Sequence, residues 1–362
     1  MFEVNPSFWS GKRIFLTGHT GFKGGWLTLW LAKMGAEVVG YSLPPNTTPN
    51  LYNLARIENL LYKSYFADIR DLDCLQNAMR ESRPEIVIHM AAQPLVRYSY
   101  ENPVETFSTN VMGTVNVLES LRSIESVVAT LIVTTDKCYD NKEWVWGYRE
   151  NDPLGGRDPY SASKGCAEMV TSAYRESFFN SIKKNRNAIA SARAGNVIGG
   201  GDWSDDRLIP DALKAFDAKK TLHIRNPYAI RPWQHVLEPL SGYLILLQQL
   251  YEKGFEFASG WNFGPNNQSY CSVSDVVSML IKKLNIEALV EINQSDQVHE
   301  ANFLKLDCSK ANQQLNWYPR WNIETSLEKI ANWQKALQGG KDMYEYSLLQ
   351  ITEYLAYKNH EN

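Results

Sequence analysis

The chain has 362 residues, of which 21% are charged, and its formal net charge at pH 7 is −3. This length can bury a large core and predicts two lobes. Because no basic block is present, we expect no nucleic-acid partner. No apolar run approaches the length that spans a membrane, and residues 1–6 do not resemble a secretory signal, so we expect a cytoplasmic protein with no membrane partner.

Cysteine and histidine give no sign of a disulfide framework or a metal site. The cysteines are five in number, scattered, and without a C-x-x-C pair, so we expect reduced thiols. The six histidines show no spacing typical of metal ligands, so we expect no bound metal.

The first predicted elements are a strand over residues 13–17 and a helix over 26–34, joined by a glycine-spaced turn. In a dinucleotide-binding turn of this kind, glycines let the backbone approach a pyrophosphate and the helix N-terminus supplies amides. The spacing is G-x-x-G-x-x-G, which alone is a weak signal. The predicted cofactor contacts in this turn are Gly18, His19, Thr20, Gly21, Phe22, Lys23 and Gly24.

Strands and helices continue to alternate along the chain. Strands are predicted at residues 37–41, 62–66, 85–89, 127–134 and 188–192, and helices at 71–82, 104–122 and 160–182. This alternation predicts an α/β fold with a Rossmann-type, doubly wound parallel sheet, whose ligands gather at the carboxyl ends of the strands. We expect a dinucleotide-binding domain over residues 1–195, with return elements near 222–265, and a smaller, interleaved α/β substrate lobe over 196–362.

The C-terminal part is less regular. It is predicted to contain a strand near residues 261–263 and helices over 272–284 and 325–337. The tail over 339–362 has apolar positions that are too loosely periodic to predict a helix. Its docking on its own lobe is a hypothesis, and no function is assigned to it.

The end of the second predicted strand lacks the side chain that usually contacts the adenosine ribose. An Asp or Glu there suits NAD, and an Arg suits NADP. The sequence instead reads Gly40-Tyr41-Ser42, which permits only a loosely held ribose.

A phenol and an ammonium lie four residues apart in Tyr160 and Lys164. Asp158 can cap a helix and Pro159 suits its first position, so the two side chains should share one helix face. A cation beside a phenol lowers the pKa of the phenol, so Tyr160 could take a proton from a substrate hydroxyl at neutral pH. For this pattern alone, a surface tyrosine and lysine one turn apart is the simpler interpretation.

Six separate stretches together point to one family. They are TGHTGFKG (17–24), HMAAQP (89–94), TTDKCY (134–139), the Tyr160 and Lys164 pair, RAGNVIGGGDW (193–203) and RPWQHV (231–236). Through them the chain resembles the extended short-chain dehydrogenase/reductase family, and within it the nucleotide-sugar 4,6-dehydratases, nearest to the branch that acts on CDP-glucose.

The resemblance implies NAD as cofactor and a nucleotide sugar, CDP-glucose, as substrate. The product would be CDP-4-keto-6-deoxyglucose plus water, formed by oxidation at C4, elimination across C5 and C6, and reduction at C6. Tyr160 would take the C4 hydroxyl proton with the help of Lys164 and Thr135, and Asp136 would be the acid at C6. Other 4,6-dehydratases carry Thr-Asp-Glu here, so Lys137 could be the C5 base, a stabiliser of the enolate, or a solvated loop residue.

Two other functions remain open for this sequence. Another NAD-dependent nucleotide-sugar 4,6-dehydratase, or a 4-epimerase on the same scaffold, would also use Tyr160 and Lys164. A dinucleotide-binding regulator without turnover is the second alternative, although the intact Thr135, Asp136, Tyr160 and Lys164 set argues against it.

The resemblance also implies binding residues outside the glycine turn. Asp68 and Ile69 are candidates for the adenine, although Asp68 could equally cap the following helix. His235 could contact the nucleotide or pack under its loop. The other implied cofactor contacts are Ala91, Ala92, Gln93, Asn110 and Thr134, and the implied substrate contacts are Gln93, Asn196, Gly201, Trp203, Arg207, Arg231 and His235.

Members of the family commonly pair through two long helices, which correspond here to residues 104–122 and 160–182. Both helices carry apolar residues beyond a single stripe, which permits such pairing without requiring it. The resemblance therefore implies a homodimer, or a tetramer. The apolar residues in question are Val111, Val115, Leu118, Val170, Ala173 and Phe178.

Overall fold

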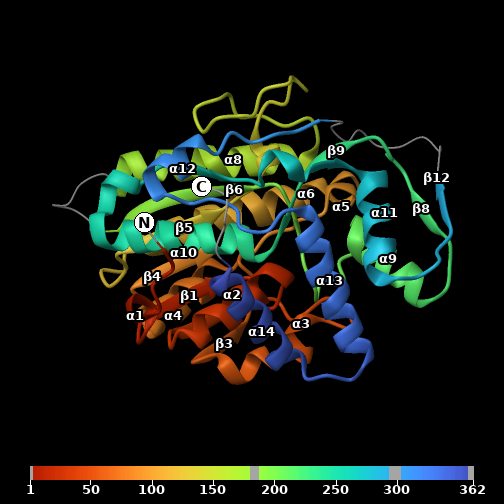
Figure 1. Ribbon diagram of the computed structural model, residues 1–362. Coiled ribbons are helices and arrows are strands. Elements are labelled where there is room, and N and C mark those ends of the chain that lie inside the picture. The colour runs from red at the N-terminus through yellow and green to blue at the C-terminus, as the bar shows by residue number, and fades with distance from the viewer. Residues whose placement is uncertain (1–2, 180–186, 293–302, 358–362) are drawn as a thin grey trace.

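A seven-stranded sheet forms the centre of the molecule (Figure 1). The computed structural model describes residues 3–179, 187–292 and 303–357. All pairings in this sheet are parallel, in the order β10-β6-β5-β4-β1-β2-β3, which confirms the predicted doubly wound sheet. Its strands are β1 (Arg13–Thr17), β2 (Glu37–Ser42), β3 (Lys63–Phe66), β4 (Ile86–His89), β5 (Ala129–Val133), β6 (Ala188–Ala194) and β10 (Gly260–Phe263).

Alternate residues along the strands face two different apolar layers. Ile14 and Leu16 pack into one cluster with helices α2 (Phe22–Lys33) and α10 (Leu237–Lys253), whereas Phe15 between them packs into the other. The second cluster includes residues of α4 (Leu72–Ser82) and α7 (Gly113–Leu121). Because side chains on a strand point alternately to its two faces, the sheet is covered by helices on both sides.

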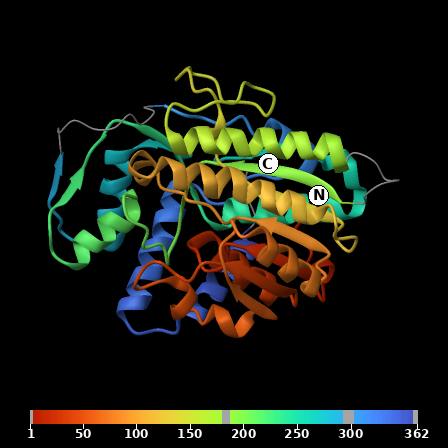
Figure 2. The same cartoon turned by 180° about the vertical axis from the view of Figure 1, so that it is seen from behind.

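Two long helical segments run side by side on the outer face in Figure 2. One consists of α6 (Pro103–Phe107), a π-helical turn (Ser108–Met112) and α7, so the predicted helix over 104–122 is confirmed. The other is α8 (Pro159–Tyr174), which continues as a π-helical turn (Arg175–Phe179). The predicted end of this helix near residue 182 lies outside the described residues.

Helix α2 begins earlier than predicted. The sequence indicated a start at residue 26, but the helix begins at Phe22. Gly24 and Gly25 interrupt the apolar pattern that the prediction followed, yet both are buried in the first turns of the helix. Residues without a side chain give no periodicity, although here they allow close packing.

A smaller group of elements lies beside the carboxyl ends of the central strands. It contains a three-stranded sheet of β11 (Tyr270–Ser272), β9 (Ile230–His235) and β7 (Asn196–Ile198), and a two-stranded sheet of β12 (Val290–Ile292) and β8 (Leu222–Ile224). β10 and α10 return to the layers of the large sheet. The predicted domain boundary stays a prediction. The remaining helices are α1 (Pro6–Trp9), α3 (Leu51–Leu54), α5 (Val96–Glu101), α9 (Leu208–Asp217), α11 (Val273–Leu284), α12 (Ser309–Leu315), α13 (Ile323–Gln338) and α14 (Met343–Ala356).

The tail, for which no helix was predicted, forms helix α14. It packs against both α13 and α2, so it does not dock on the small lobe alone (Figure 1). Tyr354 meets Trp30 of α2 edge to face at 5.7 Å, and its hydroxyl donates to Glu238 of α10 at 2.7 Å. Within the described ranges, no helix is long and apolar enough to cross a membrane.

Candidate active site

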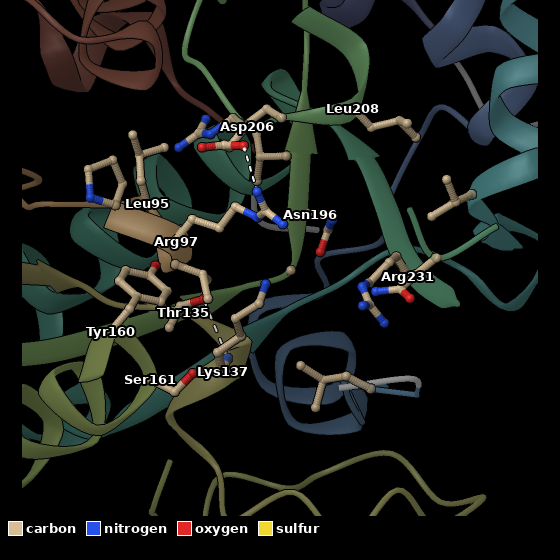
Figure 3. Close-up of a pocket in the computed structure, with 18 of the residues that line it drawn as sticks. Leu95, Arg97, Thr135, Lys137, Tyr160, Ser161, Asn196, Asp206, Leu208 and Arg231 are labelled. Carbon is tan, nitrogen blue, oxygen red and sulfur yellow. Dashed lines mark hydrogen bonds and ion pairs between the residues drawn. The ribbon is translucent and has the colours of Figure 1, made fainter. Parts of the chain in front are cut away.

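A cavity of about 340 Å³ opens where the carboxyl ends of β5 and β6 face the smaller group of elements. Figure 3 shows Thr135, Lys137 and Tyr160 together at one end of it, with Asn196 and Arg231 further along. The cavity lies at the strand ends, where the sequence predicted that ligands gather.

The start of α8 positions the Tyr160 phenol. The Asp158 carboxylate accepts from the Ser161 amide at 2.9 Å and Pro159 is the first helical residue, so the predicted helix start is confirmed. Tyr160 is 8% exposed and lines the cavity. Lys164, which is also buried, donates from Nζ to the Val133 carbonyl at 3.4 Å. The alternative of a surface tyrosine and lysine is therefore wrong.

The predicted lowering of the Tyr160 pKa is wrong for this structure. Burial raises the pKa of the phenol to about 12, which the Thr135 hydroxyl and the charge of Arg207 only partly offset. Burial also lowers the pKa of Lys164 to about 8. A neighbouring cation lowers the pKa of a phenol, but loss of solvent dominates for a phenol this deeply enclosed.

The Thr135-Asp136-Lys137 segment follows β5 as a short 3-10 turn (Asp136–Cys138). Asp136 is 1% exposed, and its Oδ1 accepts from the Thr135 hydroxyl at 3.0 Å. Its Oδ2 has no hydrogen-bond partner within the described ranges. Lys137 is half-buried and lines the cavity, which does not fit a fully solvated loop residue. A buried carboxylate oxygen without a hydrogen-bond partner is unusual, and a catalytic role is one explanation for it.

Lys23 extends from the glycine turn to the reactive end of the cavity, which it lines. Burial, together with the nearby cations Arg207 and Lys164, lowers its pKa to about 7 against the opposing effect of Asp136. The sequence predicted Lys23 only as part of a cofactor-binding turn. The structure brings its ammonium among the residues expected to carry the chemistry.

The glycine turn packs so tightly against neighbouring backbone that side chains would not fit at two of its positions. Gly18 has a positive φ of 81°, and a Cβ there would lie 2.8 Å from the Ala91 amide nitrogen. A Cβ on Gly24 would lie 2.0 Å from the Gly18 carbonyl oxygen. Bare backbone at the N-terminus of a helix is a site that suits a pyrophosphate, so these residues fit a dinucleotide.

Two other predicted cofactor contacts, Asn110 and Gln93, form hydrogen bonds to other parts of the protein. The Asn110 amide holds the backbone of Gln93 and donates to the Ser163 hydroxyl of α8 at 2.9 Å. The Gln93 side chain bonds to Leu95 and Thr106. Neither Asn110 nor Gln93 lines the cavity, because their polar groups connect the loop after β4 to α8.

The alternative role of Asp68 as a helix cap is wrong. Asp71 caps α4, because its Oδ1 accepts from the Cys74 amide at 2.9 Å. Asp68 instead forms an ion pair with Arg70 at 2.6 Å, and the side chain of Ile69 is 5% exposed. Their contact with an adenine stays a prediction. Near the missing acidic residue, the His19 ring lies 2.5 Å from a Cβ built on Gly40, so the backbone there is tightly enclosed.

The predicted substrate contacts divide into two groups. Asn196, Arg207 and Arg231 line the cavity, and Asn196 Oδ1 has no partner within the described residues. Gly201, Trp203 and His235 lie outside the cavity wall. Gly201 packs on Leu51, Trp203 packs on Trp333, and His235 is fully buried between Trp26 and Trp321.

His235 therefore follows the second interpretation that the sequence left open, in which it packs under its loop. Burial lowers its pKa to about 3, so the ring is neutral at pH 7. The opposing charge of a phosphate would favour a protonated ring, which this apolar setting disfavours.

Several cavity residues were missed by the sequence argument. Asp206 bonds to Arg225 at 3.1 Å and faces Arg97 at 3.9 Å across the cavity. Asp211 of α9 and the strand β8 line the same end. Asp206 directly precedes Arg207, a predicted contact, whereas Arg97, Asp211 and β8 lie outside the six stretches that pointed to the family.

No group of three or more histidine, cysteine, aspartate or glutamate side chains is placed to hold a metal ion in the part of the chain that the structure describes. The five cysteines are unpaired.

Comparison with known proteins gives consistent matches. The family model described as GDP-mannose 4,6 dehydratase matches residues 15–330. The chain is 53% identical over 355 residues to the CDP-glucose 4,6-dehydratase of Salmonella typhimurium, a match that covers 98% of this chain and 99% of that protein. It is 26% identical over 336 residues to a probable dTDP-glucose 4,6-dehydratase of Sinorhizobium fredii, with 89% and 92% covered.

Solved structures share the fold. The dTDP-glucose 4,6-dehydratase DesIV from Streptomyces venezuelae, with NAD and TYD bound, matches with a TM-score of 0.77 and 22% identity, covering 91% of this chain and 99% of that one. The UDP-glucose 4-epimerase of Thermotoga maritima matches with a TM-score of 0.75 and 20% identity, covering 90% and 99%. At this identity both structures support the fold alone.

Proposed function

We propose, on the premise that the chain belongs to the GDP-mannose 4,6 dehydratase family, that it is an NAD-dependent hydro-lyase which converts CDP-glucose to CDP-4-keto-6-deoxyglucose and water. The observation that carries the proposal is the 53% identity to a CDP-glucose 4,6-dehydratase over 98% of the chain. The cavity supports it, since it joins a phenol, a threonine and a lysine to a stretch of cationic and amide groups.

NAD is the cofactor that the fold and the glycine turn fit. When bound, it would accept a hydride from C4 of the sugar and return one to C6. The amides of residues 18–24 would hold its pyrophosphate, because this turn leads into the N-terminus of α2. Lys164 would hold the nicotinamide ribose. The hydrogen bond from its Nζ to the Val133 carbonyl oxygen positions the lysine side chain.

The first step removes the proton from the C4 hydroxyl, and Tyr160 is the proposed base. Its pKa of about 12 must fall when the site is loaded. Thr135 and Arg207 already act in that direction. A hydrogen bond from the Thr135 hydroxyl and the positive charge of Arg207 both stabilise the phenolate form of Tyr160.

The second step removes the C5 proton and expels the C6 hydroxyl as water. Asp136 is the proposed acid, since it lies between the cavity residues Thr135 and Lys137 and its buried Oδ2 has no hydrogen-bond partner within the described ranges. Lys137 lines the cavity next to it and acts on C5, either as the base or by stabilising the enolate. A ketone at C4 makes the C5 proton more acidic. Elimination therefore takes place only after C4 has been oxidised.

Incubation with CDP-glucose in deuterated water tests the proposal. A dehydratase gives a 4-keto-6-deoxy product with deuterium at C5, which mass spectrometry and NMR would detect. A 4-epimerase would give an unlabelled C4 epimer, and a regulator without turnover would return the starting sugar. Either of these last two results would refute the proposed function.

We also propose that the chain forms a homodimer through α6–α7 and α8, in the cytoplasm. These helices expose large apolar side chains next to one another, whereas Leu118, predicted for this surface, is buried in the core. Unpaired cysteines suit a reducing compartment. Sedimentation over a range of concentrations, with Met169→Glu as the disrupting variant, tests the pairing. The exposed residues are Val104, Phe107, Met112, Met169 and Phe178.

A further inference from the structure

The cavity has three chemically different parts along its length. The reactive end holds the Tyr160 phenol, the middle is polar and cationic, and the far end has both apolar and charged side chains. Figure 3 shows Leu208 on the opposite side of Asn196 from Tyr160. The middle part comprises Asn196, Arg207 and Arg231, and the far end comprises Leu208, Ile209, Leu222, Ile224 and Val273.

A nucleotide sugar has the same three parts in the same order. Its hexose is at one end, its diphosphate lies between, and its base is at the other end. If the hexose reacts at Tyr160 and the diphosphate meets Arg207 and Arg231, the base reaches the far end, where Leu222 and Ile224 are 4% and 5% exposed. This placement rests on the proposed function. Apolar contacts bind any base, so discrimination between bases must come from a polar group in the wall.

Asp211 is such a group. It lies one turn beyond Arg207 on α9, with its backbone amide donating to the Arg207 carbonyl at 2.9 Å, and it lines the cavity. The two other aspartates at this end are already bonded, Asp202 to Arg207 at 3.0 Å and Asp206 to Arg225 at 3.1 Å. The Asp211 carboxylate makes no hydrogen bond or ion pair to any side chain within the described ranges.

The charges around Asp211 leave it ionised at mildly alkaline pH. Burial raises its pKa to about 6, while Lys214 and Arg225 act in the opposite direction and Asp205 and Asp206 add to the rise. Above that pH the group is a carboxylate, which accepts hydrogen bonds and cannot donate one.

We propose that Asp211 reads the base, by accepting a hydrogen bond from the N4 amine of cytosine and by rejecting the O4 carbonyl of uracil and thymine. Cytosine presents a donor at position 4, whereas the other two pyrimidines present an acceptor there. A carboxylate that faces an acceptor forms no hydrogen bond with it, and the two partial negative charges repel each other. Asp211 is therefore a specificity residue for the cytidine nucleotide.

Calorimetric binding of CDP and of UDP to the whole chain at pH 8 tests this without turnover. The wild-type chain should bind CDP about ten- to a hundredfold more tightly than UDP. In Asp211→Asn that ratio should fall close to one, because an amide both donates and accepts and so serves either base. The matched control is Asp205→Asn, which changes an 81% exposed carboxylate that bonds to Lys214 and does not line the cavity.

The ratio in the control should equal that of the wild-type chain. Equal binding of CDP and UDP by the wild-type chain, or an unchanged ratio in Asp211→Asn, would overturn the inference. A different result would refute the proposed function alone. In that case the chain would prefer CDP and lose this preference in Asp211→Asn, but it would form no 4-keto-6-deoxy sugar. Product formation with an unchanged ratio in Asp211→Asn would leave the function intact and remove Asp211 from it.

Discussion

Replacing Arg193 should destabilise the protein strongly, because this residue ties the catalytic helix to the sheet. Arg193 of β6 forms an ion pair with Glu168 of α8 at 2.8 Å, and the two side chains are only 5% and 3% exposed. Glu168 follows Lys164 by one turn and also accepts from Thr134 and Ser191. Arg193→Met leaves this carboxylate buried without its cation, which costs about 3–5 kcal/mol in comparable pairs.

Urea unfolding measures this free energy, with Arg149→Met as the control. Arg149 pairs with Asp307 but its side chain is 72% exposed, so its loss should cost less than about 1 kcal/mol. Adding Glu168→Gln to Arg193→Met should return part of the lost stability, since a neutral amide is easier to bury than an unpaired carboxylate. If Arg193→Met costs no more than the control, or the double variant is less stable still, the charge-burial reasoning is wrong.

Three further predictions concern the catalytic phenol, a buried histidine and the C-terminal helix. Tyr160→Phe should reduce turnover of CDP-glucose by about 10²–10⁴-fold with an unchanged circular dichroism spectrum, and equal turnover to the exposed control Tyr228→Phe would exclude Tyr160 as the base. The folded pKa of His235, about 3, lies below its ordinary 6.5, so its contribution to stability is complete above pH 6.5 and lost as the pH falls toward 3. In urea unfolding between pH 7 and 5, His235→Asn should lose stability less steeply than the wild-type chain, and equal slopes would contradict the assignment. Tyr354→Phe removes the hydroxyl that donates to buried Glu238 and should lower the free energy of unfolding by about 1–3 kcal/mol, a result that an unchanged urea midpoint would refute.

Some local signals were predictable from the sequence, whereas effects that depend on tertiary packing were not. The helix start at Asp158 and Pro159 was predictable because capping acts within one turn. The direction of the Tyr160 pKa was wrong, since it depends on how many distant segments enclose the phenol. Asp71 caps α4, whereas the sequence also offered Asp68, three positions earlier, for this role. The residue types alone do not distinguish the two.

The contacts of Asp206 show why part of a site cannot be predicted. Asp206 pairs with Arg97 and with Arg225, and these three residues come from separate segments outside the six stretches that pointed to the family. Conversely, His235 lies inside a motif that the family shares, yet it packs between tryptophans and does not line the cavity. A shared motif identifies a fold and a chemistry, but a position in that motif can serve packing.

The contact between α14 and α2 has a consequence for biosynthesis. Trp30, near the beginning of the chain, receives its cover from Tyr354, which a ribosome adds more than 300 residues later. Until α14 has been synthesised, the side of α2 that contains Trp30 lacks this cover. Nascent chains with exposed apolar surface tend to aggregate or to bind chaperones. Fragments that end before α14 should therefore aggregate on expression and give a low yield of purified protein, even though they contain every residue of the glycine turn.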